Sequence, residues 1–504
     1  MELVFQKTGL PYLKYVLQDI RNQEETGEMI VPDSEPDMES IIFSYADAVI
    51  RGKDCKNGCV VISGGIHGGI IYAAEDNIGP KNLRFYLPYT MKFEHPAITE
   101  QAKVICKMHV RSADGRMLNS RKAMLRVNLC CSVTVMEERE ELLFEPSSLP
   151  ETIQTLDNIY TVSQPIEMSE KAFTISETLE FQENRPPVVQ IVKENCRLEL
   201  HESKLVGNKG VFKGLAYFKC LYRSEDAELY TYEQQIPFSQ YCEFGSDYED
   251  ERLEVIPVLT GYDLQTDGVM PLHLAQLSIH ILVQCVVHGN KSIHVIEDAF
   301  CIGEELLPKW QQYHLNCRLD DQLERVRMRC QFHEGISRVL DSDVYVDAPS
   351  TVHNGEDISV TVPILVQILA VNESGALVCM QERMQDIQKT ALSEHGNCVS
   401  WADVCGTVSH SVFSGGAEVH YELLKTNCFT TTQDIRSLCG GEVRASETGS
   451  VRRPSVIIKR TAEGTELWTI AKENQSRIKD ICEANKLAND VVLDSDRMLL
   501  IPVG

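Results

Sequence analysis

Positive charge is scarce in this sequence. Its 504 residues contain 48 Lys and Arg against 74 Asp and Glu, which gives a net charge of −26 and a pI of about 5.0. Nucleic acids and anionic membranes bind cationic surfaces, so we expect the chain to bind no nucleic acid. The longest apolar run, Leu277–Val287, is too short and too polar to cross a bilayer, so we expect no membrane insertion. Residues 1–7 lack the pattern of a signal peptide, which predicts a cytoplasmic protein.

Metal-binding and catalytic motifs are also missing. The 18 cysteines are scattered from Cys55 to Cys482, form no CxxC pair and have no histidine at ligand spacing beside their tightest groups. This distribution predicts reduced, mostly buried thiols and no metal site. No GxSxG, HExxH, GxxxxGKS/T or helix-opening GxGxxG motif occurs. We therefore predict a protein that is not an enzyme and needs no cofactor.

Two segments of the chain repeat the same landmarks. Gly64 and Tyr72 are eight residues apart, and so are Gly214 and Tyr222. A proline precedes each glycine and a proline–aromatic pair follows each tyrosine, with spacings that agree within one residue: Pro36, Pro88-Tyr89, Pro187, Pro237-Phe238. Such agreement predicts an internal repeat. The glycine-rich stretch 64–69 lies inside this β pattern, which favours a bulge or a tight bend over a phosphate site.

Each repeat ends in a run of alternating apolar and polar residues. The apolar positions are Leu125, Val127, Leu129, Cys131, Val133 and Val135, and then Leu277, Ile279, Ile281, Val283, Cys285 and Val287. This period predicts a strand with one buried face, and places His280 and His288 on the other, solvated face. Together with many turn signals, it predicts a multidomain, mainly β fold of repeated β-sandwich-like modules.

A third, degenerate repeat is expected in the C-terminal half. Ile364–Gly375 has the same strand-then-turn shape, whereas Leu315–Cys330 fits either an extended or a helical conformation. The expected domains are 1–30 (N-terminal segment), 31–140 (repeat 1), 141–170 (acidic connection), 171–305 (repeat 2), 306–440 (connection and degenerate repeat 3), 441–454 (linker) and 455–504 (a small domain).

The last fifty residues predict a small α+β domain of order β-α-α-β. Residues 456–459 and 498–502 have strand patterns, and two apolar stripes at helical spacing lie between them. We expect the hydroxyls of Thr465 and Ser476 to cap the two helices.

This domain resembles the LysM family. The resemblance lies in residues 464–471 (GTELWTIA), 481–487 (ICEANKL) and 499–502 (LLIP). It implies the βααβ fold and a groove in which many LysM domains hold N-acetylated sugars of peptidoglycan or chitin. The sequence departs from the family pattern at Thr465 and Glu466, which border that groove.

The repeats resemble the SPOCS domain of Clostridia. The resemblance rests on residues 31–39 (VPDSEPDME), Gly64–Tyr72, Pro88 and residues 118–122 (LNSRK), and the second copy keeps the glycine and proline landmarks. SPOCS repeats followed by one LysM domain resemble SipL-like spore coat morphogenetic proteins. That resemblance implies a mother-cell protein at the forespore coat surface. It also implies that the LysM domain binds stage IV sporulation protein A, the coat-anchoring ATPase.

The candidate binding face belongs to the LysM-like domain. Residues 452–504 contain nine basic and eight acidic residues, so this part is near +1 and the rest of the chain carries about −27. Trp468 is either a packing residue or a partner-facing anchor, because tryptophan is enriched at interface hot spots. The candidate residues are Val456, Lys459, Gly464, Thr465, Glu466, Trp468, Leu487 and Asn489.

Three functions remain open at this point. The favoured one is a non-enzymatic scaffold of the spore coat whose LysM domain binds the coat ATPase, with self-assembly of the repeats as a further option. The alternative is a protein that binds peptidoglycan of the cortex or cell wall. A hydrolase hidden in a SPOCS unit has the least support, because no activated nucleophile or carboxylate pair is identifiable.

Overall fold

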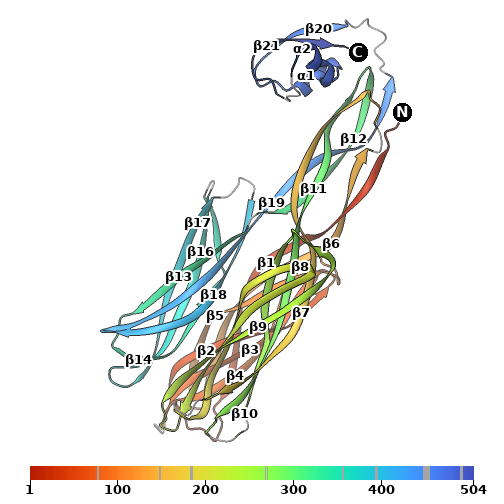
Figure 1. Ribbon diagram of the computed structural model, residues 1–504. Helices are drawn as coiled ribbons and strands as arrows, with labels where there is room; N and C mark the ends of the chain where they lie inside the picture. Colours follow the sequence, from red (N-terminus) through yellow and green to blue (C-terminus); the bar gives the residue numbers. More distant parts are fainter. Residues whose placement is uncertain are drawn as a thin grey trace.

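The protein is built mainly from long antiparallel strands, as its computed structural model shows (Figure 1). The structure describes residues 1–75, 79–146, 149–181, 186–266, 268, 271–319, 321–354, 357–391, 396–445, 455–487 and 492–503. In this part of the chain, helix occurs only in the C-terminal module. The expected fold class, mainly β with a small α+β module at the C-terminus, is confirmed.

The first unit contains two three-stranded sheets. Its last strand, β6, pairs with β1 and β5, and β3 pairs with β2 and β4. One apolar core contains residues of both sheets, including Ile66 and Leu125. The strands are β1 (Phe5–Ile30), β2 (Met38–Lys56), β3 (Cys59–Ala74), β4 (Lys81–Glu94), β5 (Lys103–Asn119) and β6 (Lys122–Pro146).

The second unit repeats this arrangement. Its last strand, β11, again pairs with the first and the penultimate strand, while β8 and β9 form the other sheet. Its core contains Phe212, Phe218 and Leu277. The strands are β7 (Ile153–Glu180), β8 (Val188–Ser224), β9 (Leu229–Tyr248), β10 (Arg252–Thr266) and β11 (Leu274–Cys301).

The third unit follows the same plan. The last strand, β19, pairs with β12, β13 and β18, and β16 pairs with β14, β15 and β17. The segment that begins at residue 306 was expected as a connection, and this is corrected: it forms strands whose partners lie about 100 residues later in β19. The strands are β12 (Glu304–Arg318), β13 (Gln322–Phe332), β14 (Ile336–Val346), β15 (Ser350–Asn354), β16 (Asp357–Asn372), β17 (Leu377–Ala391), β18 (Gly396–Phe413) and β19 (Gly416–Ala445).

The first and last strands of each unit pair with each other as a ribbon that leads away from the units. The ribbons join residues 5–13 to 138–146, 153–162 to 291–301, and 304–318 to 430–445. We call the three ribbons together the stalk (Figure 1). They share one apolar core: Leu10, Tyr12, Leu143, Val162, Ile293, Val295, Tyr313, Leu315, Cys317 and Ile435.

Two expected boundaries are therefore corrected. Residues 5–30 of the expected N-terminal segment form β1, and most of the expected acidic connection at 141–170 belongs to the end of β6 and the start of β7. The acidic side chains of Glu138 and Glu140 are exposed on the stalk strand β6. A strand with one face in solvent accommodates such charges as well as a loop does.

The repeated glycines permit close packing. A Cβ atom at Gly64 would lie 2.0 Å from the Val49 carbonyl oxygen and 2.6 Å from Tyr89 Cζ. At Gly214 it would lie 2.3 Å from the carbonyl oxygen of Glu199 and 2.5 Å from Cζ of the ring of Phe238. Each glycine thus lets the aromatic residue of its own repeat approach the strand closely.

The LNSRK element, which carries part of the SPOCS resemblance, folds back onto residues 31–37. The guanidinium of Arg121 donates to the carbonyl oxygens of Val31 and Pro32, both at 3.0 Å, and to Asp37 Oδ1 at 2.8 Å. Ser120 Oγ donates to the other Asp37 oxygen at 2.9 Å. These hydrogen bonds lower the pKa of Asp37. The element therefore fixes the turn between β1 and β2.

The two alternating runs are strands, and the predicted apolar face of each is buried, but Cys130, Gln284 and Val286 of the opposite faces are buried as well. All twelve apolar side chains are at most 1% exposed. His280 is exposed as expected, but His288 is only 4% exposed, which corrects the expectation for that residue. The β7–β11 register shifts beside His288, and Arg318 of the third unit lies 2.9 Å from its Nε2. Contact between units therefore buries a position that the strand pattern places in solvent.

The C-terminal module has the predicted βααβ order. Its elements are β20 (Val456–Thr461), α1 (Leu467–Asn474), α2 (Ile478–Asn485) and β21 (Arg497–Pro502). The predicted caps are wrong: α1 and α2 are preceded by Glu466 and Arg477, neither of which makes a side-chain cap. The hydroxyl of Thr465 instead donates to the Ala462 carbonyl, and that of Ser476 to the Pro502 carbonyl.

Other expectations concern the linker, the membrane and the cysteines. Residues 441–445 of the expected linker belong to β19, and residues 446–454 lie outside the described part. Within the described ranges, no helix has the length and apolar character to cross a membrane. The 18 cysteines, all within the described ranges, form no disulfide, and most are buried.

Candidate functional site

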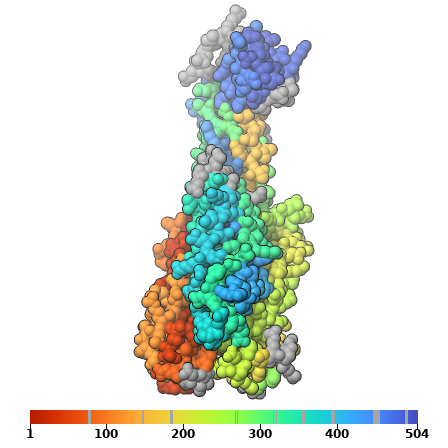
Figure 2. All heavy atoms as spheres, turned by 90° about the vertical axis from the view of Figure 1, so that its left-hand side faces the viewer, coloured from red at the N-terminus to blue at the C-terminus, as the bar shows by residue number. Residues whose placement is uncertain are grey.

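The LysM-like module lies at the tip of the stalk, remote from the three units (Figure 2). Helix α1 faces the end of the β7–β11 ribbon. Trp468, the second residue of α1, is only 4% exposed, and its ring meets the ring of Phe300 edge-on at 5.2 Å between centroids. Leu156 and Ile302 of the ribbon pack against the same cluster. Of the two roles considered for Trp468, the structure shows packing, and the packing partner is the stalk.

A carboxylate completes this contact. Asp298 accepts a hydrogen bond from Trp468 Nε1 at 2.8 Å, and Lys472 Nζ lies 2.7 Å and 2.5 Å from its two oxygens. Burial opposes the charge of Asp298, but the bonds to Lys472 and Trp468 outweigh it and lower the pKa of the carboxyl. The register of β7 and β11 shifts between Ile296 and Asp298, and bulges of this kind redirect a side chain.

The loop between β20 and α1 is tied to the segment before β21. Gly464, with φ of +80°, donates its N–H to the Leu493 carbonyl at 2.8 Å, and Leu493 donates to the Thr465 carbonyl at 3.0 Å. The backbone of Glu466 forms an isolated β-bridge with Val492, and the Glu466 side chain is exposed. These loop residues lie together at one end of the module, beside the start of α1.

The outer face of the β20–β21 sheet carries four exposed apolar side chains beside Arg460. Val456, Ile458, Met498 and Leu500 are 50%, 63%, 60% and 41% exposed, and Ile458 lies opposite Leu500 in the pairing. Val456 is therefore separate from Trp468, although a shared patch was expected. Of the other candidates, Lys459 forms an ion pair with Glu473 at 2.6 Å, Leu487 packs on the module core, and Asn489 lies outside the described residues.

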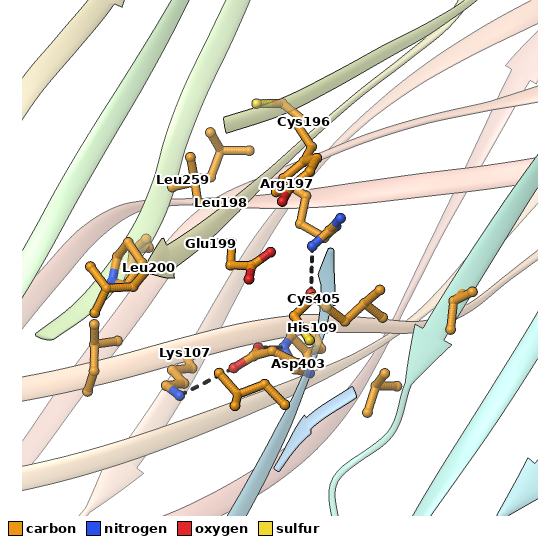
Figure 3. Close-up of a pocket in the computed structure, with 18 of the residues that line it drawn as sticks. Lys107, His109, Cys196, Arg197, Leu198, Glu199, Leu200, Leu259, Asp403 and Cys405 are labelled. Atoms are coloured by element: carbon orange, nitrogen blue, oxygen red, sulfur yellow. Dashed lines mark hydrogen bonds and ion pairs between the residues drawn. The ribbon is translucent and has the colours of Figure 1, made fainter. Parts of the chain in front are cut away.

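A second candidate site is a cavity of about 1200 Å³ between the three units. Figure 3 shows charged side chains from all three on its wall. Asp403 of β18 contacts His109 Nε2 at 2.8 Å and Lys107 Nζ at 3.5 Å, both on β5. Arg197 of β8 donates to the Val404 carbonyl at 2.6 Å, and Glu199 accepts the N–H of Gly406 at 2.7 Å. Each of these charges is used to join two units.

A buried ion cluster extends this wall. Lys193 of the second unit lies 2.7 Å from Asp341 and 2.5 Å from Asp343, both in β14, and Lys219 contacts Asp341 at 2.6 Å. Beside it, burial raises the pKa of Asp47 to about 7. These residues were not predicted from the sequence, because their partners are separated by more than 100 positions and no local pattern marks them.

Two thiols on the described wall of the cavity are not activated as nucleophiles. Burial raises the pKa of the wall thiols Cys196 and Cys405, which disfavours the reactive thiolate. No group of three or more metal-ligating side chains occurs in the described ranges. The paired charges on the wall hold the units together.

Comparisons with known proteins identify the two kinds of domain. Residues 187–265, which include β8 to most of β10, match the family described as SipL, SPOCS domain, and residues 466–502 match the LysM domain family. No curated protein and no solved structure matches the chain. SPOCS and LysM are non-catalytic binding domains, and together they indicate a sporulation coat-associated protein with a peptidoglycan-binding-type domain. The chain is therefore SipL-like, with a SPOCS domain of the SipL type followed by a C-terminal LysM domain.

Proposed function

We propose that the protein is a non-enzymatic assembly scaffold of the spore coat, acting in the mother cell at the forespore surface. The observation that carries this proposal is the pairing of SPOCS architecture with a LysM domain at the tip of a stalk. The second and third units bury an ion cluster between them, and the stalk holds the LysM domain away from the three units. Such a molecule is suited to connect two layers of an assembly.

We further propose that the LysM domain binds the coat-anchoring ATPase, stage IV sporulation protein A, and so drives coat encasement of the forespore. Its nearly neutral charge supports this, because the −27 of the remaining chain is remote from the contact. The proposed contact residues are Val456, Lys459, Gly464, Thr465, Glu466, Trp468, Leu487 and Asn489. Val456 is the most useful of these to test, since it is exposed and supports no core.

The test is capture of the ATPase by the full-length chain with Val456→Glu. Val352→Glu is a matched control: Val352 is also on a strand and is 55% exposed, against 50% for Val456. We expect Val456→Glu to lose most of the captured ATPase and Val352→Glu to retain it. Equal capture by both variants would show that the outer sheet face is not part of the interface. Absence of capture by the unaltered chain would show that the ATPase is not the partner.

Binding of peptidoglycan is the second candidate function. It is supported by the LysM match and by the loop at 464–466, in which Gly464 and Glu466 are exposed. Co-sedimentation of the full-length chain with purified peptidoglycan tests it, with Glu466→Ala as the loop variant. Absence of saturable binding would eliminate this function. Imaging of a fluorescent fusion through sporulation distinguishes coat, cortex and vegetative wall.

A further inference from the structure

One face of the LysM domain already has a ligand, which belongs to the same chain. The segment Asp298–Phe300 supplies a carboxylate to Trp468 Nε1 and Lys472 Nζ and an aromatic ring to the Trp468 indole. Phe300 is 6% exposed and Trp468 is 4% exposed, so the apolar part of the contact excludes solvent. The contact therefore resembles the recognition of a short peptide that carries an acidic and an aromatic residue.

The polar part of this contact is specific. Asp298 receives donors from two successive turns of α1, four residues apart. Charged hydrogen bonds of this kind are about twice as strong as neutral ones. The donor Trp468 is buried, and the acceptor Asp298 is 26% exposed. Lys472 is 45% exposed, so its ion pair with Asp298 contributes less than the Trp468 bond. Replacement of Asp298 by asparagine would leave these donors one neutral amide oxygen in place of a charged carboxylate.

We propose that the stalk segment Asp298–Phe300 is an internal ligand that covers the Trp468 face of the LysM domain until a protein segment with an adjacent carboxylate and aromatic side chain displaces it. This inference rests on the proposed function only in that the displacing ligand is a protein. An outside ligand can bind only those molecules in which the face is uncovered. Its apparent affinity is therefore the intrinsic affinity multiplied by the fraction of uncovered molecules. The stalk would thus set the affinity of the LysM domain for its partner.

The first test measures whether Asp298 holds the domain. The chain has only three tryptophans, so a Trp310→Phe/Trp401→Phe background leaves Trp468 as the sole reporter. In this background Asp298→Asn is compared with Asp157→Asn, an acid of the same ribbon that contacts His294 and is 46% exposed. We expect Asp298→Asn to shift the docked–undocked equilibrium by about 10-fold, with red-shifted emission and stronger acrylamide quenching. Unchanged emission and quenching would overturn the proposal.

The second test measures whether the face accepts an outside copy of the internal ligand. The probe is a fluorescent peptide of residues 294–302 with Cys301→Ser, titrated into the full-length chain. We expect it to bind the Asp298→Asn chain about 10-fold more tightly than the unaltered chain, by the same shift in equilibrium. Equal affinity for the two chains, or binding to neither, would overturn the proposal. Neither test contains the ATPase, so a failed capture experiment refutes the proposed function and leaves this inference standing.

Discussion

Lys193 should be one of the most sensitive side chains in the body of the protein. It belongs to the second unit, contacts Asp341 and Asp343 of the third, and lies 5.3 Å from the centroids of Phe43 and Tyr45 of the first. Burial opposes its charge, but the two aspartates outweigh burial and raise the pKa of the ammonium. Lys193→Met keeps the length of the side chain and leaves Asp341, which is 1% exposed, with Lys219 as its remaining cation.

The size of the effect follows from this geometry. Breaking a buried ion pair from one side costs about 3–5 kcal/mol, and the remaining pair with Lys219 places Lys193→Met near the lower end. The assay is urea unfolding followed by circular dichroism, with the free energy taken from the first transition. Lys213→Met is the control, since Lys213 and Glu202 are both 54% exposed and such pairs contribute at most about 1 kcal/mol. A loss for Lys193→Met no larger than that of the control would refute the reasoning.

Three further predictions concern pH, packing and thiols. Burial raises the pKa of the Asp47 carboxyl to about 7, and this carboxyl faces Lys193, Asp343, Asn195 and Tyr262. The folded state therefore loses stability as pH rises from about 4 to 7. Because Asp47 lines the cavity and is only partly shielded from water, we expect Asp47→Asn to gain about 1–3 kcal/mol at pH 8 and nothing at pH 4 in thermal unfolding; equal gains would contradict this. Gly64→Ala should lower the free energy of unfolding in urea by about 1–3 kcal/mol, because the new Cβ atom would clash with the backbone. Gly261→Ala should lower it much less, because the nearest atom to its new Cβ would be 3.6 Å away. Similar losses for the two variants would contradict this prediction. Burial raises the pKa of Cys106 and Cys130 to about 12, so a thiol reagent at pH 8 should label them only after unfolding, and rapid labelling of the native chain would count against their burial.

The features that sequence analysis predicted well are those set by neighbouring residues. The alternation from Leu125 to Val135 identified a strand because side chains of a strand point to opposite faces in turn. The spacing of Gly64 and Gly214 identified a repeat because each glycine makes room for an aromatic ring of its own unit. The βααβ module was predictable for the same reason, since all the buried residues of its core except Phe300 come from about fifty consecutive residues.

The features that were missed depend on residues far apart in the chain. β12 was not identifiable as a strand because its partner in β19 lies more than 100 residues later. His288 was predicted to be solvated because no residue near it in the sequence indicates that Arg318 packs against it. The contact between Trp468 and Asp298 spans 170 positions and depends on a bulge that leaves no mark in the sequence.

The closure of the stalk has a consequence for the order in which the protein is made. Near the tip, Leu3 donates its N–H to the carbonyl of Gly441 at 2.8 Å, and the backbones of Glu2 and Glu442 form an isolated antiparallel β-bridge. During synthesis the start of β1 leaves the ribosome long before residue 441, so this junction is among the last to form. Each unit, in contrast, can pair its own first and last strands as soon as its last strand emerges. The molecule should therefore assemble unit by unit from the N-terminus, with the stalk tip sealed only after the third unit has folded.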